Sequence, residues 1–359
     1  MGSHGITNPP AEKIVKAFGA DTMVPSPTRS LKPMAPSSPS ARTAGHKPAL
    51  AAFSALAAGW VFVLVTLGAF TTSIGAGMAF PDWPLSNGSL NPAGWLTNVA
   101  MFAEHSHRLS AGLMTLLTVA LAAWIWRSES RRWLRRLSLF AVGLVVAQAV
   151  VGGLRVRLDP VQVAAVDTSL GRLFAMLHAC LAQAFACTLI AIAAGCSRAW
   201  VTRPSGVGCA VRRAGTACCA LVFLQLGIAA VMRHSFAGLA IPSFPWSRPD
   251  GGLLPAAWDF RVGIAFAHRA MACVVAAAVA VFAAAIWRDR ASTLAMRCGA
   301  AGLVGLLALQ ILLGAQIIRT SRDPAATTAH VLVGALTLAA AFWLAWLAHR
   351  DQVEAPSGT

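Results

Sequence analysis

Eight long apolar runs restrict the folds open to this 359-residue sequence more than any other feature. Each run is close to the ~20 residues that a helix needs to cross the hydrocarbon core of a bilayer. Backbone N–H and C=O groups cannot stay unpaired in lipid, so the runs are predicted to be transmembrane helices. They are Leu50–Thr72, Leu96–Trp126, Leu137–Leu154, Ser169–Cys196, Ala214–Met232, Val262–Trp287, Cys298–Ile318 and Ala325–Ala348. The predicted fold class is therefore an all-α membrane protein with eight transmembrane helices.

The composition agrees with this class and excludes others. Hydrophobic residues make up 57% of the chain and charged residues 12%, against about 25% charged residues in a soluble domain. The net charge of +16 does not indicate nucleic-acid binding, because the basic residues lie between the apolar runs and form no soluble basic domain. None of the eight cysteines precedes Cys180, and none has CxxC or metal-site spacing, so they are interpreted as small buried hydrophobic residues.

An internal duplication divides the chain into two units. GAGMAFPDWP at Gly75–Pro84 is followed by EHSHR at Glu104–Arg108, and FAGLAIPSFP at Phe236–Pro245 is followed by AFAHR at Ala265–Arg269. The glycines, prolines and final histidines of the two copies match at one constant offset, which is typical of a repeat. Four helices per unit give both units the same orientation. We therefore predict two tandem four-helix bundles related by a pseudo-two-fold axis along the membrane normal.

The charge pattern predicts the topology. The segment Ser73–Ala103 contains no Lys or Arg, whereas arginines follow the second, fourth and sixth helices. The positive-inside rule then places both termini in the cytoplasm and the Gly/Pro loops outside. The predicted organisation is a disordered cytoplasmic tail (1–47), an N-terminal four-helix unit (48–197), a cytoplasmic linker (198–213), a C-terminal four-helix unit (214–350) and a cytoplasmic tail (351–359).

Four histidines are predicted at one depth, in the outer halves of the second, fourth, sixth and eighth helices: His107, His178, His268 and His330. An ionisable residue inside a membrane helix is costly and indicates a functional site. Two facing neutral imidazoles in an apolar helical bundle are typical of haem-iron ligation. Zinc fits less well, because neither unit supplies a third or fourth ligand at useful spacing.

The surroundings of these histidines differ between the units. Glu104 precedes His107 by three residues and shares its helix face, whereas Ala265 holds the matching position in the second unit. A catalytic role for Glu104 and an ion pair with Arg108 are both open and are compatible. Arg108 and Arg269 suit the carboxylate of a haem propionate, with snorkelling to the membrane interface as the alternative.

Other polar residues of the helices have simpler interpretations. His234, next to Arg233 at the outer end of the fifth helix, could reach a propionate, while His105 is predicted to face away from the histidine site. Two matched pairs, Gln148 with Gln310 and Gly152 with Gly314, are interpreted as contacts between neighbouring helices.

The motifs GAGMAFPDWPLSNG, EHSHR, RHSFAGLAIPSFP, FAHR and TTAHVLVGA resemble the haem A synthase family over roughly Leu50–Ala348. The resemblance implies a multi-pass enzyme of the bacterial inner membrane. It would oxidise the C8 methyl group of haem O to the formyl group of haem A for terminal oxidase assembly. Haem O would be the substrate and haem b the resident cofactor. A haem O synthase and an electron acceptor are implied as partners, and a homo-oligomer is left open.

The resemblance also implies roles by position. His268 and His330 would ligate the iron of haem b, with Arg269, Arg233 and His234 near its propionates. The residues that would border the substrate haem O are His107, His178 and Arg108. Glu104 would be the acidic residue that methyl oxidation requires.

The loops depart from the pattern of many bacterial members, which have cysteines where this chain has Phe80 and Ser86. The second loop has Ile241 and Ser247 at the matching positions, and Ser243 replaces the usual acid. A disulfide within these loops is therefore not expected. This favours a member of a cysteine-less type and leaves open a divergent paralogue.

Two other functions compete with synthesis of haem A. A membrane cytochrome b would need two equivalent bis-histidine sites without an acid, and the contrast of Glu104 with Ala265 argues against it. A transporter typically has broken helices near the membrane midplane, whereas the polar residues here lie toward the outer edge.

Overall fold

The computed structural model describes residues 45–163 and 168–355 of the chain. The predicted N-terminal tail (1–47) lies almost entirely outside these residues, as does the end of the predicted C-terminal tail.

The described residues form eight long helices, each of 25 to 30 residues and apolar enough to cross a membrane. They are α1 (Pro48–Ser73), α2 (Val99–Ser128), α3 (Arg132–Arg157), α4 (Leu170–Cys196), α6 (Cys209–His234), α7 (Phe260–Arg288), α8 (Leu294–Arg319) and α9 (Pro324–Ala348). The short elements are β1 (Gln162–Val163), β2 (Thr168–Ser169), α5 (Arg198–Thr202), η2 (Ala237–Leu239) and α10 (Arg350–Glu354). The predicted eight helices and the all-α membrane class are confirmed.

Polar residues at the helix starts explain several of these boundaries. In five helices, backbone N–H groups of the first turn donate hydrogen bonds to the side chain of the residue just before the helix. These residues are Asn98 for α2, Ser169 for α4, Asp259 for α7, Thr293 for α8 and Asp323 for α9. Two helices begin a full five residues earlier than their apolar runs. Helix α3 begins at Arg132 rather than Leu137, and α6 begins at Cys209, inside the predicted 198–213 linker. Arginine-bearing turns continue a helix beyond the hydrocarbon core, because the side chains can extend toward water.

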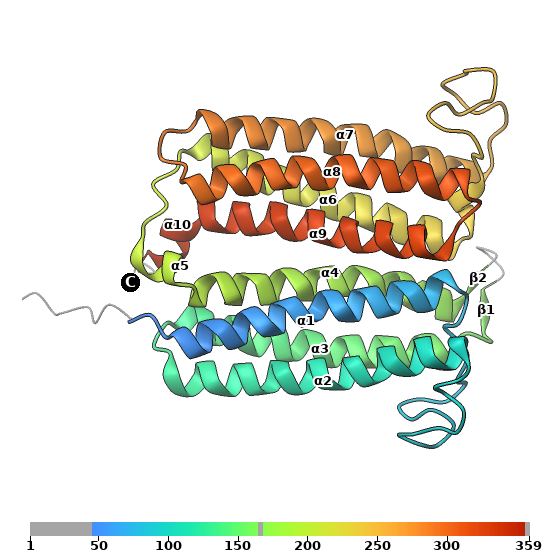
Figure 1. Ribbon diagram of the computed structural model, residues 1–359, viewed down its shortest axis with the longest axis horizontal. Helices are drawn as coiled ribbons and strands as arrows, with labels where there is room; N and C mark the ends of the chain where they lie inside the picture. Colours follow the sequence, from blue (N-terminus) through green and yellow to red (C-terminus); the bar gives the residue numbers. More distant parts are fainter. Residues whose placement is uncertain (1–44, 164–167, 356–359) are drawn as a thin grey trace, which may run out of the picture. The chain divides into compact units, whose positions relative to one another are not determined.

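Helices α1–α4 pack around one another as a closed four-helix bundle, and α6–α9 form a second one (Figure 1). Helices α1 and α4 of the first bundle contact α9 of the second, and α4 also contacts α6. The predicted pseudo-two-fold axis between the bundles stays a prediction. Exposed apolar side chains such as Leu116 and Leu312 lie on the outer helix faces, where lipid would surround them.

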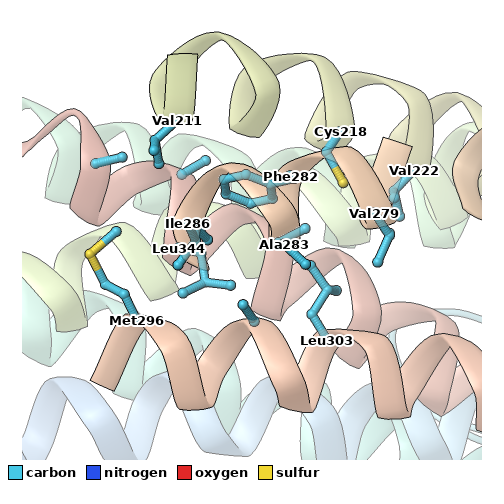
Figure 2. Close-up of a cluster of buried hydrophobic side chains, with 14 of the residues drawn as sticks. Val211, Cys218, Val222, Val279, Phe282, Ala283, Ile286, Met296, Leu303 and Leu344 are labelled. Carbon is cyan, nitrogen blue, oxygen red and sulfur yellow. The ribbon is translucent and has the colours of Figure 1, made fainter. Parts of the chain in front are cut away.

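Each bundle has its own apolar core. In the second bundle Phe282 of α7, Leu303 of α8 and Leu344 of α9 meet side chains of α6 (Figure 2). In the first bundle the buried cluster includes Leu121 and Leu189. The cores fix the spacing of the helices and thereby position the histidines.

The two Gly/Pro loops lie at the same end of the helices, at the right of Figure 1. One joins α1 to α2, and the other joins α6 to α7 and contains η2. Each loop contains a cis X-Pro peptide bond, at Trp83–Pro84 and Phe244–Pro245. At this end Arg233 of α6 donates a hydrogen bond to Ser73 Oγ of α1 (2.9 Å), which links the two bundles.

Candidate functional site

Arg108 of α2 holds the first loop against the helices. Its Nη1 donates to Asp82 O (2.8 Å) and Leu85 O, and its Nη2 donates to Phe80 O (3.2 Å). Nη2 also pairs with Glu104 Oε1 at 2.6 Å. Four of the five guanidinium N–H groups are therefore engaged by the protein itself. Only the N–H group at Nε is left for the predicted contact of Arg108 with the substrate.

Arg269 of α7 holds the second loop in the same way. Its Nη2 donates to Ile241 O (2.8 Å) and its Nη1 to Trp246 O (3.2 Å). In the duplication these two carbonyls match those of Phe80 and Leu85, so both halves share one arginine clamp on the loop. The sequence indicated the matching arginines but not their loop partners.

Glu104 is the point at which the two clamps differ. It is 4% exposed, and its Oε2 accepts a hydrogen bond from the backbone N–H of the fully buried Phe80 (3.1 Å). The ion pair with Arg108 that the sequence left open is present. The matching residue Ala265 is buried and offers no acceptor. A buried carboxylate thus lies one helical turn from His107 in the first bundle, without a counterpart in the second.

His268 of α7 and His330 of α9 face each other in the second bundle. Their ring centroids are 6.5 Å apart, with an interplanar angle of 60°. Two imidazoles that share one metal ion have ring centres about 6–7 Å apart, because each metal–nitrogen bond is about 2.0–2.1 Å long. The spacing of the two rings therefore fits axial ligation of a haem iron.

Two glutamines contact these rings. Gln225 Nε2 lies 3.1 Å from His268 Nδ1, and Gln310 Nε2 lies 3.2 Å from His330 Nε2. The expected role of Gln310 as a contact between helices is confirmed. Gln225 was missed by the sequence analysis, although a polar residue within the apolar run of α6 is the signal that could have found it.

His107 of α2 and His178 of α4 lie against glycines of the first bundle. A Cβ atom at Gly68 of α1 would lie 2.8 Å from His107 Cε1, and one at Gly152 of α3 would lie 3.1 Å from His178 Cε1. A side chain at either glycine would therefore push the histidine ring out of its place, more strongly at position 68 than at position 152. Both rings have a buried Nδ1 without a hydrogen-bond partner within the described residues. Such atoms are costly, so they indicate a site that a ligand completes.

The remaining polar residues at this end divide into loop contacts and bundle contacts. His105 faces away from the histidine site, as predicted, and its nitrogens contact Ser86 Oγ (3.0 Å) and Leu90 O (3.1 Å). Arg233 donates to Ala69 O of α1 at 2.9 Å, in addition to its bond with Ser73. Its predicted place near a propionate, like that of His234, stays a prediction.

Comparison with known proteins places the chain in a family. The model of the cytochrome oxidase assembly protein family matches residues 51–342, which is most of the chain. A haem A synthase of Bacillus licheniformis is 29% identical over 240 residues, covering 64% of this chain and 74% of that protein. One of Bacillus pumilus is 27% identical over 225 residues, covering 60% and 68%. One of Maricaulis maris is 36% identical over 112 residues, covering 29% and 33%.

The match spans both bundles, including both loops and all four histidines. The resemblance that the loop and histidine motifs carry is therefore confirmed over the membrane-spanning part of the protein. The chain belongs to the cytochrome oxidase assembly protein family, to which its haem A synthase motifs had assigned it.

Proposed function

We propose that this protein is a haem A synthase, which oxidises the C8 methyl group of haem O to the formyl group of haem A for terminal oxidase assembly. One observation carries the proposal. The two halves share the same arginine clamp and paired histidines, but only the first bundle has a buried carboxylate, Glu104, beside them. Such asymmetry suits one half that reacts and one half that transfers electrons.

In the first bundle His107 and His178 border the substrate haem O. Removing a hydrogen from the methyl group, and later releasing water from a gem-diol, both require proton transfer close to the substrate. Glu104 has the position for this task. Its Oε1 is engaged by Arg108, while Oε2 accepts one hydrogen bond, from Phe80 N, and keeps a second lone pair for a proton.

In the second bundle His268 and His330 would hold haem b, which would supply electron transfer. The backbone O of Gln310 lies 3.1 Å from His330 Nδ1 and can accept the ring N–H there, which orients the ring as outer-shell partners commonly do for metal-ligating histidines. Arg269, Arg233 and His234 lie toward the propionates. The absence of an acid at Ala265 suits a site that binds a haem without performing proton chemistry.

The function is tested in a bacterial host that makes haem O and lacks a haem A synthase of its own. We expect extracted haem to contain haem A when this gene is expressed, and haem O without haem A when it is not. If the folded, haem-loaded protein yields only haem O, the proposal is wrong. The bis-histidine membrane cytochrome b would then be the better assignment.

We place the protein in the bacterial inner membrane with both termini in the cytoplasm, because arginines follow α2, α4 and α7 at the end opposite the Gly/Pro loops. A haem O synthase would supply the substrate, and an electron acceptor would take up the electrons. A reporter fused after Arg350 should be active only in the cytoplasmic form. Activity of the periplasmic form would contradict this topology.

A further inference from the structure

Arg155 of α3 lies at the histidine site of the first bundle, and the function proposed so far gives it no role. It follows Gly152 by three residues and therefore shares its helix face. Gly152 is the glycine that lies against the His178 ring. The guanidinium of Arg155 is thus one helical turn from that ring, toward the loops.

The same guanidinium reaches the loop that covers Glu104. Arg155 Nη1 donates a hydrogen bond to Gly77 O, and a Cβ atom at Gly77 would meet both terminal nitrogens of Arg155. The loop residue Phe80, three positions later, donates to Glu104. Arg155 therefore lies between the loop, the acid and the His178 ring.

Within residues 45–163 and 168–355, most of the hydrogen-bonding capacity of Arg155 is unused. Among the described residues Gly77 O is its single acceptor, and no carboxylate forms an ion pair with it. The charges of Glu104 and Asp159 act on Arg155, but both oxygens of Glu104 already have partners, and Asp159 Oδ1 accepts a hydrogen bond from Ser169 Oγ. Arg108 is the opposite case, since four of its five N–H groups are bound within the protein. A free, partly buried arginine matches a bidentate carboxylate.

The second bundle has no arginine at this place. The offset that pairs Gln148 with Gln310 and Gly152 with Gly314 pairs Arg155 with Ile317. Gly314 lies against His330 as Gly152 lies against His178, so the two positions are comparable in the structure. The cation is thus specific to the half that carries Glu104.

We propose that Arg155 binds a carboxylate of the porphyrin substrate in the first bundle and so fixes how the substrate lies beside Glu104. This inference rests on the proposed function for the identity of the substrate, a porphyrin with two propionates. It assigns to Arg155 the part in substrate binding that the sequence had suggested for Arg108. Arg155 acts by positioning and is not expected to exchange protons.

The experiment compares two ligands that differ only in their carboxylates. The purified protein is titrated with haem O and with its dimethyl ester, and binding is followed by absorbance. In R155I, which copies Ile317, haem O should bind about tenfold more weakly or worse, because a hydrogen bond to a charged group is lost. The ester should bind to R155I as it does to the unmodified protein. R155K should recover part of the affinity for haem O.

A matched control is Arg157→Ile, two residues along α3. Arg157 is exposed and contacts the same loop through Trp83 O (3.3 Å). It should leave both affinities unchanged. Equal weakening of acid and ester in R155I would show a structural role and overturn the proposal, as would unchanged binding of haem O.

Failure of the proposed function gives a different result. If the protein prefers the free acid through Arg155 but makes no haem A, the synthase assignment is wrong and the carboxylate site at Arg155 stands. If it makes haem A but shows no preference for the free acid, the synthase assignment stands and the proposal for Arg155 is wrong. If neither haem O nor its ester binds, both proposals are wrong.

Discussion

The α1–α4 and α6–α9 bundles are built on one local plan. In each, an arginine directly after a histidine donates to two carbonyls of the preceding loop, at matching positions. In each, a glycine of the third helix lies against the histidine of the fourth. These contacts fix the position of the loop and of the paired histidines, and they are the same in both bundles.

The bundles differ in a few polar and small residues close to the histidines. The first has Glu104 and Arg155 where the second has Ala265 and Ile317. The second has Gln225 on a ring where the first has an apolar residue. A duplicated bundle can therefore be specialised without changes to its framework. Glu104 and Arg155 add two charged groups near the first site, while the amide of Gln225 contacts a histidine ring at the second.

The largest effect on this comparison is expected from Glu104→Gln, which keeps the shape of the side chain and removes its acid–base chemistry. Haem A formation should fall by about 10²–10⁴-fold, the usual contribution of general acid–base catalysis. The haem b content should stay the same. Haem extraction and absorbance measure the two quantities. Asp259→Asn is the control, because it removes a carboxylate at the start of α7 and keeps the helix cap. Normal haem A formation in Glu104→Gln would leave Glu104 as a structural partner of Arg108.

Histidine variants of the two bundles are expected to differ in how much haem b they retain. His268→Ala or His330→Ala should remove most of the low-spin haem b, because each removes one of the two ligands proposed for its iron. His107→Ala should retain more of it, since that ring lies in the other bundle. The absorbance of the purified variants measures this. Equal loss in all four single-histidine variants would contradict a resident haem confined to the second bundle.

A smaller effect is expected from Gly68→Ala in the first bundle. The added Cβ would lie 2.8 Å from His107 Cε1, so the ring must shift. We expect haem A formation to fall by roughly tenfold, below the ~10² that a 1 Å displacement of a catalytic group can cost. Haem b should be unaffected. Gly227→Ala of α6 is the matched control, because no atom lies near its added Cβ. An equal loss in both variants would exclude the contact with His107 as the cause.

The smallest effect concerns Asp82 in the first loop, where the second loop has Ser243. Burial alone would raise the pKa of Asp82, but hydrogen bonds from the N–H groups of Gly88 and Asn87 and the charge of Arg108 lower it below its ordinary value of 3.8. A lowered pKa in the folded loop stabilises it above pH 3.8, and this stabilisation is lost as the pH falls through the folded value.

Hydrogen exchange measures this difference between the loops. The amides of Asn87 and Gly88 should exchange faster under acid than the general pH trend predicts, whereas the amide of Ser247 in the second loop should follow that trend. Asp82→Asn should abolish the contrast. An unchanged acid response in Asp82→Asn would show that Asp82 is not the titrating group.

Much of the fold was predictable because lipid leaves the backbone few options. A run of about 20 apolar residues in a bilayer must be a helix, so eight runs gave eight helices. The ends were less predictable. The predicted apolar runs begin only after the arginines, whereas α3 and α6 begin earlier, at Arg132 and Cys209, and include those charged turns.

Local spacing also indicated which contacts were open to residues of one helix. The separation of Glu104 and Arg108 by four residues places them on one face, and they form the ion pair. His105 turns away from His107 for the same geometric reason.

The contacts between helices were decided by the tertiary structure. The pairs Gly68 with His107, Gln225 with His268 and Arg155 with Gly77 join residues far apart in the sequence. Helical periodicity gives the direction in which a side chain points around the axis of its own helix. It does not give the distance or the rotation of the neighbouring helix. Those depend on how the side chains of both cores fill the space between the helices, which no single segment determines.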